Sequence, residues 1–513
     1  MGRTSSTLNG SIKGSMANQL FLTKSHAVLL EELRGENRLH RVLGPVQLSA
    51  LGVGAIIGTG IFVLTGVAAH DRTGPALMLS FVVAGITCVF AALCYAEFAS
   101  MVPVAGSAYT YAYATLGELF AWIIGWDLIL EYAVASATVA HGWSHYFQDF
   151  LSIFHLGLPN VFTNAPFDYL PATGRLTLTG TWVDLPAIVI ALLVTIVLVK
   201  GIRESASLNA GIVILKIAIV LFVIGVGSMH VNPANWHPFA PFGFTGFSFF
   251  GHTIMGQTGK GGEPLGMLAG AAYVFFAYIG FDSVSTHAEE ARNPSRDVPI
   301  GILTSLVLCT VLYIAVAAVL TGMIPYNQIN IDAPVSDAFR QVGLPWAQFL
   351  ISVGAIAGIT SVLLVMMLSQ PRIFLAMARD GLLPPGFFAA VHERFRTPWK
   401  STILTGVCVA TMGAFLPLRI LAELVNIGTL LAFVIVCAAV LIMRRTHPDV
   451  PRPFRAPFGM VVPILGILCC LLLMFSLPAE NWLRLFVWLA IGLMIYFGYG
   501  RRHSRLANHA TKL

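Results

Sequence analysis

The chain has little charge. Asp, Glu, Lys and Arg make up only 11% of its 513 residues, whereas soluble domains carry about 25%. Hydrophobic residues reach 57%, and apolar runs of about 20 residues, long enough to cross a bilayer, recur along the sequence. This composition excludes an ordinary soluble domain and predicts an all-α polytopic membrane protein.

Cysteine and recognisable catalytic motifs are also scarce. The seven cysteines are an odd number at apolar positions, which argues against a disulfide framework or a metal site. The sequence contains no apparent nucleophile–base arrangement, cofactor loop or metal-ligand cluster, so we expect neither an enzyme nor a bound cofactor or metal. The net charge of +6 does not indicate nucleic-acid binding, because its distribution follows the apolar runs.

The apolar runs predict twelve membrane spans. Most of the 30 Lys and Arg residues lie in segments that share a side with the N-terminus. Because cytoplasmic loops are enriched in Lys and Arg, this bias predicts cytoplasmic N- and C-termini in the cytoplasmic membrane. The predicted spans are 46–69, 76–98, 120–150, 183–200, 208–229, 265–289, 299–323, 347–370, 401–417, 421–443, 460–477 and 481–500.

A cluster of glycines interrupts the first span. Gly54, Gly58 and Gly60 fall within seven positions, and each glycine weakens a helix by about 1 kcal/mol relative to alanine. In a membrane, a broken helix is tolerated only where it is buried in protein or lines a cavity. The pattern therefore predicts a discontinuous helix whose exposed amides bind an anionic group.

The sixth span carries a second interruption, at Gly280 and Asp282. Spans 1 and 6 occupy equivalent positions if the chain contains two five-span halves, and paired breaks of this kind indicate an inverted-repeat transporter with its substrate at the midplane. The predicted organisation is a five-plus-five inverted-repeat core with discontinuous helices 1 and 6. Its parts are a cytoplasmic tail (1–44), the first repeat (45–230), the second repeat with an outer loop (231–445), helices 11 and 12 (446–500) and a second cytoplasmic tail (501–513).

Ionisable residues inside predicted spans are functional candidates, and three of them carry the argument. Lys216 has no charged sequence neighbour. Burial disfavours its ammonium form, so it could release a proton, or it could donate to carbonyls of a broken helix as a sodium ion does elsewhere. Asp282 has two open roles, capping the second break or carrying a proton. Glu131 is either protonatable or paired.

Other polar residues receive simpler interpretations. Thr360 and Ser361 in span 8 could line a sodium site, but a nearby lysine would compete for the same carbonyls, so proton coupling is favoured. His141 and His145 have metal-ligand spacing without an apparent third ligand, and we interpret them as polar helix residues. Glu97, at the end of span 2, is interpreted as an interfacial structural acid.

Several motifs resemble the cationic amino acid transporter branch of the amino acid–polyamine–organocation superfamily. The resemblance covers about residues 40–500, in the same order as in the family, and it is closest to bacterial members with twelve spans. The motifs that carry it are 54–62 (GAIIGTGIF), 95–98 (YAEF), 103–111 (PVAGSAYTY), 275–282 (FFAYIGFD), 289–294 (EEARNP) and 379–384 (RDGLLP).

This resemblance implies proton-coupled uptake of L-amino acids. Lys216 matches the family's span 5 lysine, which bonds to the first break. Helix N-termini favour anions and free carbonyls favour cations, which agrees with the family's division of the substrate. The implied partners are the amino acid, protons and membrane lipid, with an accessory membrane peptide left open. The implied contacts are Ile56, Gly58, Thr59 and Gly60 for the substrate carboxylate, and carbonyls of Phe276, Ala277 and Ile279 for its ammonium group.

One position departs from the family pattern. Met366 stands where the animal cationic transporters have a small residue, and its side chain would shorten the pocket. Small neutral amino acids such as alanine are therefore the expected substrates, with larger ones left open. The alternatives are uptake of arginine or lysine, exchange of amino acids or polyamines, and, in a different class, an amino acid sensor.

Overall fold

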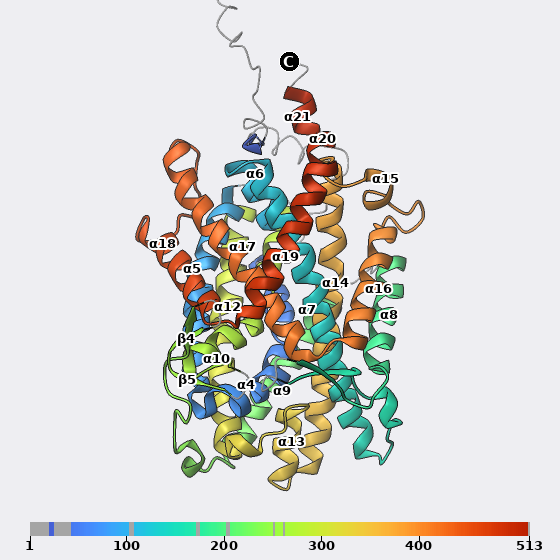
Figure 1. The fold of residues 1–513 in the computed structure, drawn as a ribbon, viewed down its shortest axis with the longest axis vertical. Helices are drawn as coiled ribbons and strands as arrows, with labels where there is room; N and C mark the ends of the chain where they lie inside the picture. The colour runs from blue at the N-terminus through green and yellow to red at the C-terminus, as the bar shows by residue number, and fades with distance from the viewer. Residues whose placement is uncertain are drawn as a thin grey trace, which may run out of the picture.

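The computed structural model describes residues 20–24, 43–101, 107–170, 175–201, 206–249, 252–259 and 262–510. These residues form an elongated bundle of helices (Figure 1). Within them, eight helices are long and apolar enough to cross a membrane, and three shorter helices are also apolar. The predicted all-α polytopic class is confirmed. The count of twelve spans and the division into two repeats remain predictions.

The first half of the bundle follows the predicted ranges closely, with span 1 divided into pieces. A helical segment at 107–115, between spans 2 and 3, was not predicted. The helices are α3 (Pro45–Ile56), α4 (Thr65–Ala68), α5 (Leu77–Met101), α6 (Ser107–Thr115), α7 (Glu118–Ile153), α8 (Leu185–Lys200) and α9 (Ala206–Ser228), with π-helical turns η1 (Gly60–Leu64) and η2 (Ala69–Thr73) on either side of α4.

The second half begins with the divided span 6. Helix α14 continues through Pro371 to Arg379, nine residues beyond the predicted end of span 8. The elements are α10 (Met267–Val274), η6 (Phe275–Tyr278), α11 (Ser283–Thr286), α12 (Pro294–Met323), α13 (Pro334–Gln341), α14 (Pro345–Arg379), α15 (Pro385–Phe388), α16 (Trp399–Phe415), α17 (Leu418–Thr446), α18 (Val461–Phe475), α19 (Ala479–Ile495), α20 (Arg501–His503) and α21 (Arg505–Ala510).

The two ends of the bundle differ (Figure 1). We call the end with α6, α15 and α21 the terminal face, and the end with α13 the loop face. Three antiparallel hairpins, which the sequence did not predict, lie in the connections between spans. They are β1 (Phe167–Leu170) with β2 (Arg175–Leu178), β3 (Phe247–Phe249) with β4 (His252–Met255), and β5 (Gln257–Thr258) with β6 (Pro264–Leu265).

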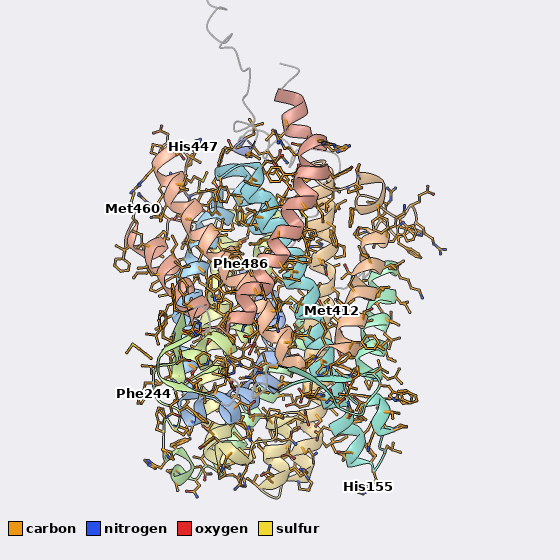
Figure 2. All side chains as sticks on the ribbon, in the orientation of Figure 1. His155, Phe244, Met412, His447, Met460 and Phe486 are labelled. Carbon is orange, nitrogen blue, oxygen red and sulfur yellow. The ribbon has the colours of Figure 1, made fainter. Side chains whose placement is uncertain are left out.

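Apolar side chains cover the flank of the bundle between its two ends. Figure 2 shows Phe486 and Met460 on this flank, with His155 near one end and His447 near the other. Both apolar side chains are exposed, as are many others on α8, α9, α18 and α19. Large apolar patches of this kind mark contact surfaces, and on a helical bundle of this length the surface suits lipid.

The interrupted helices lie at the centre. Helix α3 packs against α9, α12 and α14, and α10 packs against α5. Helix α7 packs against both α14 and α17. The long helices therefore enclose both breaks, and the backbone polar groups freed there are held inside the protein.

Candidate functional site

The first break lies where the glycine cluster predicted it. Helix α3 ends at Ile56, Ile57 has an extended backbone (φ −73°, ψ 104°), and helical structure resumes with the π-helical turn at Gly60. No described acceptor receives the N–H groups of Gly58 and Thr59. The predicted discontinuity is confirmed, and it leaves backbone donors free inside the bundle.

Side chains from two other helices bind the carbonyls on the α3 side of this break. Lys216 Nζ donates to the carbonyl oxygens of Gly54 at 2.6 Å and Ile57 at 3.0 Å. The Tyr313 hydroxyl donates to the carbonyl of Ile56 at 2.8 Å. Lys216 is completely buried, so it does not reach the interface. Sequence reasoning anticipated the lysine contact and missed Tyr313. Tyr313 could have been noticed as a tyrosine in the middle of a predicted span, because a buried tyrosine hydroxyl usually has a hydrogen-bond partner.

The second break is held by α17 and α7. Asn426 Nδ2 donates to the carbonyls of Ala272 and Tyr273, both at 3.0 Å. Asp282 accepts from the N–H of Gly280 at 3.2 Å and from the Tyr132 hydroxyl at 3.1 Å. Asp282 directly precedes α11 and accepts from the N–H of Gly280 within the break, but its side chain makes no cap bond to α11. Its two open roles stay predictions. Asn426 was missed, although a lone amide in an apolar span is itself a signal.

The two breaks touch through glycine positions that cannot hold a larger residue. Gly280 has φ +118°, and a Cβ there would lie 2.9 Å from the carbonyl oxygen of Ala55. A Cβ on Gly60 would lie 2.4 Å from Cα of Ala277. These close approaches bring the main chains of spans 1 and 6 together.

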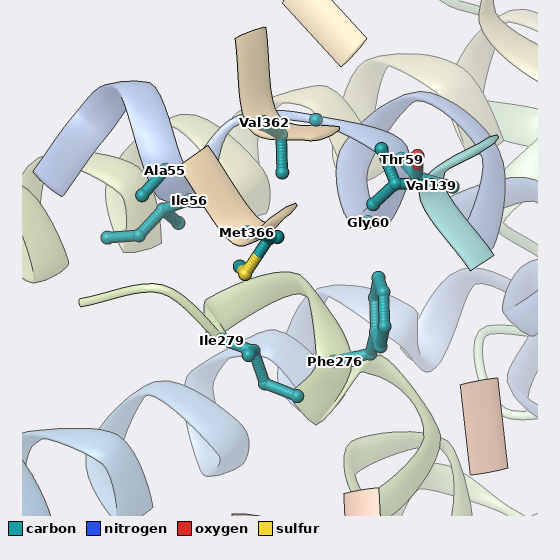
Figure 3. Close-up of a pocket in the computed structure, with 10 residues that line it drawn as sticks. Ala55, Ile56, Thr59, Gly60, Val139, Phe276, Ile279, Val362 and Met366 are labelled. Atoms are coloured by element: carbon teal, nitrogen blue, oxygen red, sulfur yellow. The ribbon is translucent and has the colours of Figure 1, made fainter. Parts of the chain in front are cut away.

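A small pocket lies between the breaks (Figure 3). Seven of the eight predicted substrate-binding residues line it, and Ala277 instead backs Gly60. Figure 3 shows Val362 and Met366 extending from α14 towards this space, with Phe276 and Ile279 across it. The lining residues are Ala55, Ile56, Gly58, Thr59, Gly60, Val139, Phe276, Ile279, Val362 and Met366.

Free polar groups gather around the pocket while its side chains are mostly apolar. The Thr59 hydroxyl is buried and has no partner among the described residues. The backbone donors of Gly58 and Thr59 belong to span 1, whereas carbonyls of Ala277 and Ile279, to which no described donor is recorded, belong to span 6. The arrangement offers donors for an anion on one side and acceptors for a cation on the other.

Glu131 lies outside the pocket lining. It is 2% exposed, and neither carboxylate oxygen has a hydrogen-bond partner among the described residues. The nearby Thr429 hydroxyl instead donates to the carbonyl of Val425 at 3.1 Å. The described contacts give Glu131 no partner, and whether it carries a proton stays a prediction.

The remaining polar residues are engaged elsewhere. Thr360 accepts from Trp143 Nε1 at 2.9 Å and donates to the carbonyl of Ile356, while Ser361 donates to the carbonyl of Gly358. These hydroxyls are therefore bound within the protein. Glu97 pairs with Arg444 and Arg452, as expected of a structural acid. His141 and His145 lie next to Asp184 and Asp332 respectively, and the described residues contain no metal-type cluster of three such groups.

Comparison with known proteins identifies the family. The family model described as amino acid permease matches residues 43–498. The chain belongs to the amino acid permease family. It is 47% identical to the methylthioribose transporter of Bacillus subtilis (strain 168) over 93% of this chain and 98% of the relative. It is 48% identical to the branched-chain amino acid permease BcaP of the same organism, over 96% of this chain and all of the relative.

More distant relatives confirm the resemblance found in the motifs. The vacuolar cationic amino acid transporter 4 of Arabidopsis thaliana is 40% identical over 81% of this chain and 65% of its own length. The protein is therefore a multi-pass membrane transporter of a permease family, and the members of that family are not enzymes. Its preferred substrate, its coupling ion and the roles of its pocket residues are matters for proposal.

Proposed function

We propose that this permease takes up neutral L-amino acids across the cytoplasmic membrane, coupled to protons, by alternating access. The observation that carries the proposal is the pocket between the two breaks, with backbone donors on one side, backbone acceptors on the other and apolar side chains between them. A zwitterion with an uncharged side chain matches this arrangement.

The backbone groups suit the two charged ends of an amino acid. The free N–H groups at Gly58 and Thr59, together with the Thr59 hydroxyl, would bind the carboxylate. The carbonyls of Ala277 and Ile279 would bind the ammonium group. Phe276 contributes its ring to the pocket, while its carbonyl already accepts from the N–H of Ile279 at 3.1 Å.

The side-chain end favours a neutral substrate. Val139, Val362 and Met366 are apolar, and none of the described lining residues is charged. Arginine or lysine would require a carboxylate partner, because burying an unpaired charge is strongly unfavourable. A ribose derivative would present several hydroxyl groups, and the lining side chains offer only the Thr59 hydroxyl to bind them.

Branched-chain amino acids are a second candidate beside small ones such as alanine. Two relatives named branched-chain amino acid permease, from Bacillus subtilis and Lactococcus lactis, are 48% and 35% identical to this chain. The lining is apolar, so its polarity suits the side chain of valine or leucine as well as the methyl group of alanine. Met366 limits the available length in either case.

Lys216 is the proposed link between protons and the first break. When charged, it bridges the carbonyls of Gly54 and Ile57, the place that a sodium ion would take in a sodium-coupled protein of this architecture. Loss of its proton would weaken both bonds and loosen α3 from α9. Glu131 is the proposed proton partner, and Asp282 keeps the second break in shape. The Lys and Arg bias favours a cytoplasmic terminal face.

The test is uptake by purified protein in liposomes with an imposed pH gradient. Labelled alanine, leucine, arginine and methylthioribose would be compared at equal concentration. We expect accumulation of alanine and leucine, little of the other two, and collapse of accumulation when a protonophore removes the gradient. Accumulation that follows a sodium gradient instead would refute the coupling, and binding without uptake would favour an amino acid sensor.

A further inference from the structure

Asp127 is a buried acid that the proposed transport cycle does not yet use. It lies on α7, is 1% exposed, and neither of its carboxylate oxygens has a hydrogen-bond partner among the described residues. No described ion pair includes it. Helix α17 packs so closely that a Cβ on Gly428 would lie 2.8 Å from Asp127 Oδ1. The carboxyl group is thus enclosed between two helices.

The other buried acids among the described residues, apart from Glu131, have hydrogen-bond donors. Each accepts at least one hydrogen bond, from an arginine, a hydroxyl or a backbone N–H, as a buried carboxylate requires. Only Asp127 and Glu131 lack such a donor among the described residues. The partnered acids are Glu97, Glu118, Asp184, Asp282, Asp297, Asp337 and Glu423.

Asp127 and Glu131 lie one helical turn apart. Four residues at 1.5 Å each separate them by about 6 Å along the axis of α7. The titratable groups near Glu131 are Asp282 at the N-terminus of α11, Tyr95 from α5, and Tyr132 and Asp127 on α7 itself. The recorded neighbours from α17 are uncharged: Gly428 lies beside Asp127 and Thr429 lies near Glu131. No cation approaches either carboxyl group among the described residues.

These surroundings decide the protonation state. An ionised carboxylate without a donor or counter-ion in a membrane interior is strongly disfavoured, and such a group neutralises instead. Two adjacent carboxyl groups reinforce the effect, because two like charges so close cannot both be present at low energy. We therefore expect Asp127 to hold a proton in this conformation.

We propose that Asp127 is a second proton-binding site that passes the coupled proton between Glu131 and the terminal face. The inference rests on the proposed proton coupling. Asp127 lies nine residues from Glu118, the first residue of α7, or about 14 Å from the terminal face along the helix. Glu131 lies one turn deeper, towards the pocket residue Val139.

The transfer is simple to balance. The Glu131 carboxylic acid gives its proton to an ionised Asp127, directly after a side-chain rotation or through one bridging water, and becomes a carboxylate. Glu131 then takes up a new proton from the pocket side, and only after that does Asp127 release its own proton towards the terminal face and become a carboxylate in turn. Only one of the two groups needs to be ionised at any step, which avoids paired charges in the bundle.

The first experiment detects the proton itself. Dicyclohexylcarbodiimide, an apolar reagent, reacts with protonated carboxyl groups in membrane interiors, and mass spectrometry of the full-length protein locates the label. In the Glu131→Gln variant only Asp127 remains of the pair, and we expect it to be labelled. Absence of label on Asp127 in both this variant and the unmodified protein would overturn the proposal.

The second experiment separates coupling from transport. In liposomes, Asp127→Asn should lose accumulation driven by a pH gradient while substrate-for-substrate exchange continues, so the ratio of accumulation to exchange falls. The control is Asp449→Asn, an exposed acid beyond α17, which should behave as the unmodified protein. Undiminished accumulation by Asp127→Asn would overturn the relay. Absence of gradient-driven accumulation in the unmodified protein would refute the proposed function instead, and the labelling result would still decide whether Asp127 is protonated.

Discussion

Lys216 shows how one residue stabilises a broken helix inside the membrane. Its ammonium group donates to two carbonyls at the C-terminal end of α3, those of Gly54 and Ile57, and Tyr313 donates to a third. A buried acceptor left without a donor destabilises a protein by about 1–3 kcal/mol. The first break is therefore held by side chains from α9 and α12 that lie far from it in sequence.

Substitution of Lys216 by methionine should remove both transport and stability. Methionine has a similar length but no donor, so we expect loss of gradient-driven uptake and a free energy of unfolding lower by about 2–6 kcal/mol, for two unpaired carbonyls. Thermal unfolding of the purified protein in detergent measures the second effect. Lys200→Met, at an exposed lysine, is the control, and equal melting temperatures for the two variants would contradict this role.

Met366 is the residue at which substrate length should change. Serine in its place removes most of a side chain that lines the pocket, so the Met366→Ser variant should take up arginine better relative to alanine. Competition between labelled alanine and unlabelled arginine in liposomes measures this ratio. Ser369→Ala, one turn along α14 and absent from the lining, is the control. An unchanged ratio would mean that Met366 does not limit the pocket.

Some residues of the candidate site can be predicted from the sequence and others cannot. Lys216, Glu131 and Asp282 were predicted because a charge in an apolar span is conspicuous. Val139 and Val362 were missed because an apolar residue in an apolar span carries no mark of the cavity it faces. Tyr313 lies 257 positions from Ile56, and only the packing of α12 on α3 brings them together.

At the level of elements, glycine determined what could be predicted. The clusters at Gly58 and Gly280 weaken helices locally, so both breaks could be located from sequence. The β hairpins could not, because their strands of two to four residues are too short to show an alternating pattern. Helix α14 was predicted too short, at a point where Pro371 suggests an end, yet the helix continues through that residue to Arg379.

Gly280→Ala should damage the contact between the two breaks. A non-glycine residue at a strained backbone conformation of this kind costs of order 1–3 kcal/mol, and the added Cβ would also meet the Ala55 carbonyl at 2.9 Å. We expect a lower melting temperature and weaker substrate binding. Gly225→Ala is the matched control, since its position on α9 has open space and an ordinary φ. Equal effects from both variants would show that the close approach is unimportant.

On the scale of the whole molecule, the described ends of the chain meet at one place on the terminal face. The main chain of residues 20–24 bonds to α6 and α7 through Lys24 N to Tyr113 O at 3.0 Å and Glu118 N to Leu22 O at 3.1 Å. From the other end, Ser504 donates to Glu118, and the N–H of Arg505 donates to the carbonyl of Asp380 at 3.0 Å. Both ends are thus joined to α7 and to the end of α14.

The ion pair between Lys24 and Asp380 should hold the N-terminal segment on this face. Their side chains meet at 2.8 Å, and the Tyr109 hydroxyl donates to the same carboxylate at 2.6 Å. The pair is mostly buried, so its loss in Lys24→Ala should cost about 1 kcal/mol of binding free energy between residues 20–24 and this face. That loss should raise the population in which residues 20–24 are released by roughly fivefold. Limited proteolysis of the protein in liposomes, followed by mass spectrometry of the N-terminal peptides, measures the release, and Lys400→Ala is the control. Because the backbone bonds of residues 22–24 remain in the variant, its cleavage should still be slower than that of a fully released segment. A cleavage rate equal to that of the control would mean that the main-chain bonds alone secure the segment.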